Sequence, residues 1–203
     1  MKKTVYKLSS LFLVILLCSP VLSLASAQKK NTGSDADPLA DLSLNAFKLR
    51  SIGPALTSGR IADFAVNPEN PSEFYVATAS GGVWKTINAG TTFTPIFDNQ
   101  GSYSIGCVTM DPNHSHIIWV GTGENNNQRS VAYGDGVYKS TDSGQSWTHM
   151  GLKNSEHIGM IKVDPRDSNV VYVAAYGPLW SAGGDRGLYK TTDGGENWEA
   201  VLT

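Results

Sequence analysis

Two irregular segments of this 203-residue chain, 123–135 and 176–186, hold the side chains best suited to binding a ligand. Carboxylates, amides and arginines lie beside aromatic rings there, and such a mixture can form a platform for a sugar or a peptide. The candidate ligand-binding residues are Glu124, Asn125, Asn126, Asn127, Arg129, Tyr133, Asp135, Tyr176, Trp180, Asp185 and Arg186. The alternative is that the two segments pack on one another and satisfy their own polar groups. The sequence leaves both interpretations open.

The other reactive side chains indicate neither a metal centre nor an activated nucleophile. The sequence contains no HExxH, CxxC or GxSxG motif. His114 and His116 could share a metal ion, but no third ligand accompanies them. Cys107 is left alone once an N-terminal leader containing Cys18 is removed, so we expect a small buried side chain there. We therefore assign no catalytic residue, no metal site and no cofactor.

The element that must position the two segments is a nine-residue sequence motif, called the repeated phrase below. It occurs three times, about 50 residues apart, over 85–93, 139–147 and 190–198. Its recurring residues are Asn88, Gly90 and Phe93, then Asp142, Gly144 and Trp147, then Asp193, Gly195 and Trp198. Asp or Asn can accept a backbone N–H two residues on, and Gly tolerates a positive φ. The aromatic ring can cover the base of a hairpin. The phrase therefore predicts a structural turn between two strands.

Each phrase closes a longer unit of four expected strands, over about 61–97, 105–150 and 158–202. Four-stranded antiparallel units at this period are β-propeller blades, so the expected fold class is all-β with about three blades. Complete propellers typically contain about 4–8 blades. We therefore expect an incomplete propeller, either the front part of a longer protein or a truncated reading frame. Self-association of several copies into a ring is the alternative.

The strand directions assign the loops of each unit to two faces. Successive strands alternate direction, so successive connections alternate sides. The first turn of a unit and the repeated phrase fall on one side. The loop between the second and third strands and the crossover to the next unit fall on the other, which carries both irregular segments. Four aromatic residues outside the repeat positions belong to the same loops: Tyr103, Tyr133, Tyr176 and Trp180. We expect that face to bind the ligand.

The N-terminus predicts export. Three lysines precede an apolar stretch over 11–17, and small residues at 25–27 form a cleavage site, which indicates a signal peptide over 1–27. Residues 28–45 are polar and resemble a flexible linker, which leaves 46–203 for the propeller. No membrane span is expected after cleavage, so the protein would be secreted, periplasmic or displayed at the cell surface. The remaining chain has more acidic than basic residues and no basic run, which argues against nucleic acid as a partner.

The repeated phrase resembles the Asp-box of bacterial neuraminidases. That repeat also occurs in xyloglucan-cleaving glycosidases, photosystem assembly factors and sortilin-type sorting receptors. The resemblance covers about residues 59–203, and the first copy departs from it at Asn88 and Phe93. The runs 121–127 and 133–140 are similar to large secreted bacterial proteins related to the sortilin-type propeller, which are often labelled glycosyl hydrolases. That resemblance implies a non-catalytic binding module for a peptide, a protein or a glycan, as the N-terminal part of a larger protein.

The alternative function is glycoside hydrolysis of the sialidase or xyloglucanase type. The xyloglucan-cleaving enzymes that the chain resembles carry Thr-Asp-x-Gly-Gly with the Asp as catalytic base, whereas this chain has Ala79 at that place. Glycoside hydrolysis needs two carboxylates across the scissile bond. At least one of them would then lie in blades beyond this chain, and Glu124, Asp135 or Asp185 would be the local acid or base.

Overall fold

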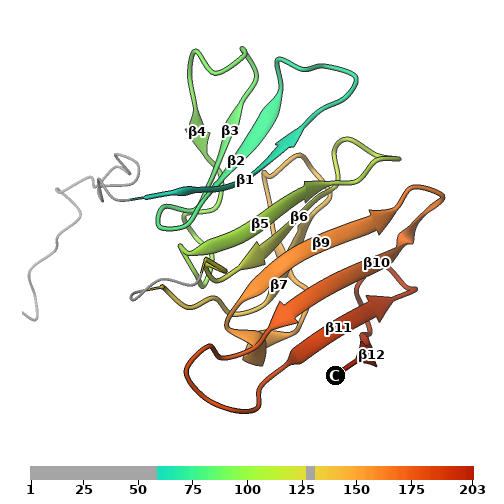
Figure 1. Ribbon diagram of the computed structural model, residues 1–203. Helices are drawn as coiled ribbons and strands as arrows, with labels where there is room; N and C mark the ends of the chain where they lie inside the picture. The colour runs from blue at the N-terminus through green and yellow to red at the C-terminus, as the bar shows by residue number, and fades with distance from the viewer. Residues whose placement is uncertain (1–58, 127–130) are drawn as a thin grey trace, which may run out of the picture. The chain divides into compact units, whose positions relative to one another are not determined.

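The computed structural model describes residues 59–126 and 131–203. The expected signal peptide over 1–27 and linker over 28–45 lie outside the described residues. The described chain forms three four-stranded antiparallel sheets, one after another in the sequence (Figure 1). The expectation of an all-β chain built from three propeller blades is confirmed.

The strands coincide with the three expected units. Blade one contains β1 (Ile61–Val66), β2 (Phe74–Thr78), β3 (Val83–Thr86) and β4 (Thr94–Pro95). Blade two contains β5 (Ile105–Met110), β6 (Ile118–Thr122), β7 (Val137–Ser140) and β8 (Thr148–His149). Blade three contains β9 (Ile158–Asp164), β10 (Asp167–Tyr176), β11 (Arg186–Thr191) and β12 (Glu199–Leu202). In every blade the strands follow sequence order, so each connection is a local hairpin.

The period of two along each strand directs alternate side chains to opposite neighbours. Tyr75 on β2 points toward blade two and joins a core cluster with Ile118 and Val120 of β6. Trp119 lies between those two residues and points the other way, into a second cluster with Val173 of β10. Blade two is therefore covered on both sides, and the first strands β1, β5 and β9 lie beside one another (Figure 1).

The backbone confirms the assignment of the loops to two faces. On one side the repeated phrase donates to the first turn of its own blade in all three copies: Ala89 N to Ser72 O at 2.9 Å, Ser143 N to His116 O at 2.9 Å and Gly194 N to Asn169 O at 3.0 Å. On the other side, Gly82 N donates to the crossover residue Tyr103 at 2.8 Å. Gly134 N likewise donates to Glu156 O at 2.7 Å, so the inserted segments and crossovers share the second face.

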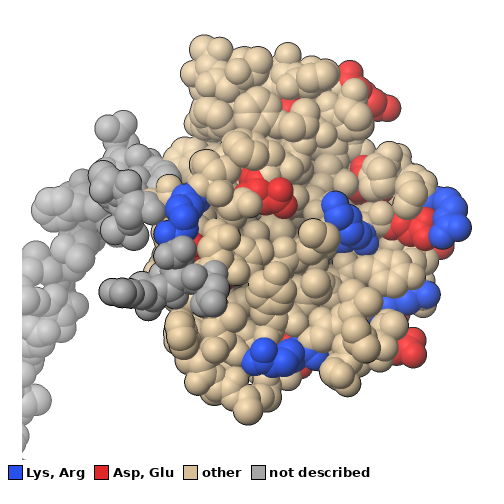
Figure 2. Space-filling model, in the orientation of Figure 1, with Lys and Arg blue, Asp and Glu red and all other residues tan. Residues whose placement is uncertain are grey.

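Charged side chains do not dominate the surface that faces the viewer. Figure 2 shows Lys and Arg as separate groups, interspersed with Asp and Glu on a mostly neutral surface. Among the described residues, none belongs to a helix long and apolar enough to cross a membrane.

Candidate functional site

The repeated turn is held by a hydroxyl and a carboxylate that divide its backbone N–H groups between them. In blade two, Ser140 Oγ accepts the N–H of Asp142 at 3.3 Å and that of Gly144 at 2.8 Å. Asp142 Oδ1 accepts the N–H of Ser146 at 2.8 Å, four residues on. The expectation that the Asp accepts an N–H two residues on was wrong, because the serine hydroxyl occupies that donor. The side chain and the backbone N–H of Ser146 lower the pKa of the Asp142 carboxyl to about 2, with help from the Ser140 hydroxyl.

The other two copies repeat this bonding. Asn88 Oδ1 accepts the N–H of Thr92 at 2.9 Å, and Asp193 Oδ1 accepts the N–H of Asn197 at 3.0 Å. The recurring glycine has a positive φ in every copy, namely 84° at Gly90, 88° at Gly144 and 102° at Gly195. The expectation of a left-handed glycine is therefore confirmed, and the amide Asn88 replaces the carboxylate without loss of the turn.

The aromatic residue that ends the phrase reaches beyond its own hairpin. Trp147 Nε1 donates to Ile96 O of the preceding blade at 2.8 Å. Trp198 Nε1 makes the equivalent bond to Met150 O at 2.6 Å. In blade one Phe93 takes this position, packs on its own blade and has no N–H to donate. The two tryptophans therefore join consecutive blades, a role that the sequence did not indicate.

The opposite face carries the candidate ligand-binding residues, and the structure buries the first of them. Glu124 is 2% exposed and forms an ion pair with Arg60. Its backbone N–H donates to Ser104 Oγ at 2.9 Å. Ala79, which stands where the related pattern has a carboxylate, is also buried, and its N–H donates to Arg60 O at 2.9 Å. Arg60 was not among the expected site residues, because only the folded chain brings it to Glu124.

Two further polar candidates hold the scaffold together. Asn125 Nδ2 donates to Gly159 O of the next blade at 3.0 Å. Asp135 accepts the Tyr138 hydroxyl at 2.6 Å and the Thr122 hydroxyl at 3.2 Å. Burial and the adjacent Asp135 carboxylate raise the pKa of Tyr138 to about 12, so this tyrosine remains a donor. Both side chains therefore have hydrogen-bond partners within the scaffold.

The polar candidates of the second segment bond to the crossover before blade three and to their own loop. Asp185 Oδ2 accepts the N–H of Asn154 at 3.0 Å. The guanidinium of Arg186 donates to the carbonyls of Pro178 and Ser181. These bonds fix the loop that presents Trp180, whose side chain is 61% exposed.

The aromatic candidates remain open to solvent. Tyr103 is 60% exposed, Tyr133 is 57% exposed and Tyr176 is 43% exposed. Hydrogen bonds to the backbone connect the segments that carry these rings. Ser102, which precedes Tyr103, donates from Oγ to Tyr133 O at 3.0 Å. The Tyr133 ring lies 5.7 Å from that of His157, whose carbonyl accepts the N–H of Tyr176 at 2.8 Å. Tyr103 and Tyr133 are loop residues, as expected. The expectation that Tyr176 belongs to a loop was wrong, because Tyr176 is the last residue of β10 and pairs with Arg186 of β11.

His157 is a buried polar residue beside Tyr133. Its Nδ1 pairs with Glu124 O at 2.8 Å, and its Nε2 has no hydrogen-bond partner among the described residues. Burial lowers the pKa of the His157 imidazole below its ordinary value.

The remaining candidates divide into exposed and undescribed positions. Asn126 is exposed, whereas Asn127 and Arg129 lie outside the described residues. His114 binds Ser168 Oγ through Nδ1 at 3.0 Å. Within 59–126 and 131–203, no group of His, Cys, Asp or Glu has the arrangement of a metal site.

Comparison with known proteins supports the fold more strongly than any activity. No family model matches the chain. A xyloglucanase of Hypocrea jecorina is 25% identical over 170 residues, which are 77% of this chain and 19% of that protein. A probable oligoxyloglucan-reducing end-specific xyloglucanase of Neosartorya fischeri is 27% identical over 155 residues, 68% of this chain and 17% of that protein. The chain therefore spans about a fifth of the length of these relatives.

Solved structures likewise match this chain over about a fifth of their own length and support a β-propeller fold. The crystal structure of the Niastella koreensis GH74 enzyme has a TM-score of 0.53 and 27% identity, covering 68% of this chain and 21% of that one. The structure of an ancestral GH74 enzyme has a TM-score of 0.55 and 23% identity, covering 71% of this chain and 18% of that one. The resemblance to the Asp-box and to sortilin-type proteins stays a prediction. The chain is a set of β-propeller blades similar to those of GH74 enzymes.

Proposed function

We propose that this chain is an exported propeller module that binds a glycan of the xyloglucan class on its aromatic loop face. The observation that carries the proposal is the exposure of three aromatic residues in the loops of that face: Tyr103, Tyr133 and Trp180. Exposed rings that no scaffold position explains are typical of binding surfaces, because a sugar ring can stack on their apolar faces. The names of the curated relatives supply the substrate class.

The polar groups of the face favour binding over cleavage within this segment. A general acid or base needs a carboxyl within reach of the proton that it transfers. Glu124 pairs with Arg60, and Asp135 accepts two hydroxyls. Asp185 holds a backbone N–H. These interactions support a positioning role for the three carboxylates and leave the contact with a ligand to the aromatic rings.

The test is binding of soluble xyloglucan, measured by calorimetry and by affinity electrophoresis. Trp180→Ala and Tyr133→Ala should each weaken binding by about tenfold, equivalent to ~1.4 kcal/mol for a central aromatic contact. Ile87→Ala is the matched control, since Ile87 is 69% exposed but lies in the repeated turn on the other face. Wild-type affinity in both aromatic variants would overturn the assignment of the face.

The second candidate function is hydrolysis of the same polysaccharide, which the names of the relatives favour. Its local acid or base would be Glu124, Asp135 or Asp185. Release of reducing ends from xyloglucan, measured with the chain and with Glu124→Gln, separates the two candidates. Release that is lost in Glu124→Gln, with xyloglucan binding retained, would replace the binding proposal by a catalytic one.

The peptide or protein ligand implied by the sortilin-type resemblance is tested in the same way. A peptide array is probed with the chain and with Trp180→Ala. We expect no peptide to bind the unchanged chain and lose that binding in Trp180→Ala. A peptide bound through Trp180, with no affinity for xyloglucan, would transfer the proposal from glycans to peptides.

A further inference from the structure

Among residues 59–126 and 131–203, four residues other than glycine hold the backbone in the left-handed region. They are Ala89, Ser143, Leu152 and Glu156, with φ values of 55°, 60°, 55° and 63°. Cβ lies too close to a carbonyl oxygen in this region, so such a residue persists only where the surrounding structure imposes the conformation. The turn or the core explains three of the four residues, and Glu156 remains.

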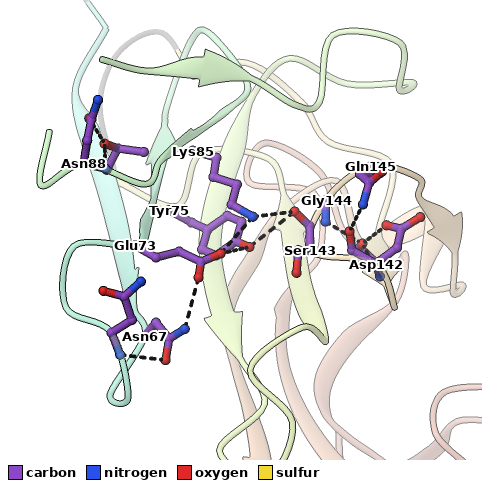
Figure 3. A network of polar contacts seen from close by, with 12 residues as sticks. Asn67, Glu73, Tyr75, Lys85, Asn88, Asp142, Ser143, Gly144 and Gln145 are labelled. Carbon is purple, nitrogen blue, oxygen red and sulfur yellow. Dashed lines mark hydrogen bonds and ion pairs between the residues drawn. The ribbon is translucent and has the colours of Figure 1, made fainter. Parts of the chain in front are cut away.

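The repeated phrase accounts for Ala89 and Ser143. Both take the turn position that Gly194 occupies in the third copy, where φ is 73°. The carbonyl of Ser143 accepts hydrogen bonds from Lys85 Nζ and from the Tyr75 hydroxyl of blade one, each at 3.3 Å (Figure 3). The left-handed turn therefore presents this carbonyl to the neighbouring blade, and the contact does not involve the Ser143 side chain.

Packing accounts for Leu152, which is 9% exposed and belongs to the core cluster that contains Trp119. Glu156 differs, because it is half-buried and carries a carboxylate. Its ψ of −27° also lies outside the usual left-handed range of about +30° to +60°. Within the part of the chain that the structure describes, neither an ion pair nor a hydrogen bond holds this carboxylate. Neither the core nor the repeated turn therefore accounts for Glu156.

Buried neighbours fix the backbone on either side of Glu156. Ser155 Oγ donates to His157 O at 2.8 Å, and both residues are fully buried. Glu156 O accepts the N–H of Gly134 at 2.7 Å. Gly123 approaches so closely that a Cβ there would overlap Glu156 O. These contacts impose the strained conformation, and the side chain of Glu156 takes no part in them.

The position of Glu156 corresponds to that of Tyr103 in the preceding crossover. Each residue lies two positions before the first strand of the next blade, which is β9 after Glu156 and β5 after Tyr103. Each also offers its carbonyl to the loop between the second and third strands of the preceding blade, at Gly134 and at Gly82. Tyr103 is one of the exposed aromatic residues of the loop face. Glu156 therefore lies on the same face.

Glu156 also lies beside Tyr133. Its carbonyl holds Gly134, the residue after Tyr133, and the ring of the next residue, His157, lies 5.7 Å from the Tyr133 ring. The three carboxylates expected at the site have partners in the scaffold, which leaves Glu156 to face a ligand. Sugar hydroxyls donate to carboxylate oxygens, and such charge-assisted hydrogen bonds are stronger than neutral ones.

We propose that Glu156 is the hydrogen-bonding residue of the glycan site and sets its preference for a neutral sugar. This inference rests on the proposed function: a sugar ring that stacks on Tyr133 donates its hydroxyls to the Glu156 carboxylate. The imposed backbone conformation fixes the base of the side chain before binding, which lowers the entropy lost on association. An anionic sugar brings like charges together and is rejected.

Binding of soluble xyloglucan to the full chain, measured by calorimetry, tests the role of Glu156. Glu156→Gln should weaken binding about fivefold, because an amide oxygen is a weaker acceptor than a carboxylate. Glu156→Gly removes the acceptor and should weaken binding about tenfold or more. Glu156→Gly should nevertheless keep or raise the unfolding midpoint, because glycine adopts a positive φ without strain. A residue with a structural role alone would not separate binding from stability in this way.

Ser143→Gly is the matched control. It also replaces a left-handed residue by glycine, but in the repeated turn on the other face, where the third copy already has Gly194. It should keep or raise the unfolding midpoint and bind xyloglucan as the unchanged chain does. Equal affinity in Glu156→Gly and Ser143→Gly, with binding weakened in Trp180→Ala, would overturn the role of Glu156 and leave the proposed function standing. A lack of xyloglucan binding by the unchanged chain would overturn both.

Competition with polygalacturonate, a polymer of an anionic sugar, tests the selectivity. Polygalacturonate should not displace xyloglucan from the unchanged chain. Displacement at the concentrations at which free xyloglucan itself competes would refute the preference for a neutral sugar.

Discussion

Trp147 provides the sharpest test of how consecutive blades are joined. Trp147→Phe keeps an aromatic ring but removes the N–H that reaches Ile96 O at 2.8 Å. Loss of that hydrogen bond costs about 0.5–1.5 kcal/mol. The smaller ring also loses part of the contact with Phe97, whose ring centroid is 5.1 Å from that of Trp147, and this loss adds to the cost. We expect a total of about 2 kcal/mol, whereas Trp147→Ala should cost about 3–5 kcal/mol.

The assay is urea unfolding followed by circular dichroism, with the free energy obtained by linear extrapolation. For a chain of this size, 2 kcal/mol corresponds to a fall in Tm of about 4–8 °C. Trp180→Phe is the control: Trp180 is 61% exposed, so the change should stay within about 0.5 kcal/mol. If the two Trp→Phe variants lost equal stability, or if Trp147→Ala cost less than about 1 kcal/mol, the interblade role of Trp147 would be refuted.

Three further predictions concern the turns and the cysteine. Because the folded pKa of Asp142 is lowered to about 2, its ionised form stabilises the turn above the ordinary value near 3.8, and this contribution is lost as the pH falls through 2. Asp142→Asn should therefore flatten acid unfolding curves between these values, and an unchanged acid limb would count against it. Gly195→Ala should cost more than about 2 kcal/mol in urea unfolding, since its Cβ would lie 2.8 Å from the Trp119 ring, while Gly194→Ala should cost about 1 kcal/mol; equal costs would contradict this reasoning. Burial raises the pKa of Cys107 to about 12, so a thiol reagent at pH 8 should label Cys107 only after unfolding, and rapid labelling at Cys107 in the native chain would show that the burial is wrong.

Much of the fold followed from local sequence. Alternation of apolar residues defines a strand over a few residues, and the turn chemistry at Asp142 and Gly144 acts within a single hairpin. Repetition then supplied the number of blades and the faces on which the loops lie. Even the error about Asp142 was local: the hydroxyl of Ser140 accepts the N–H of Gly144, the donor that was assigned to the carboxylate.

The candidate site was predicted less well, because its polar residues are satisfied by partners distant in the chain. Glu124 is paired with Arg60, which is 64 residues away. Asn125 binds a carbonyl 34 residues away, in the next blade. The exposed aromatic residues, by contrast, could be identified early, since Tyr133 and Trp180 fall outside the repeat positions that account for the other rings.

The sequence by itself determined the blades, their order and the face that carries the inserted loops, because strand alternation and turn formation depend on neighbouring residues. Only the tertiary structure decided which loop side chains form hydrogen bonds within the scaffold and which remain exposed to solvent. It also showed that Trp147 and Lys85 join one blade to the next, through hydrogen bonds that span 51 and 58 residues. Such contacts arise when one sheet packs against another, and no local pattern encodes which carbonyl a distant side chain will meet.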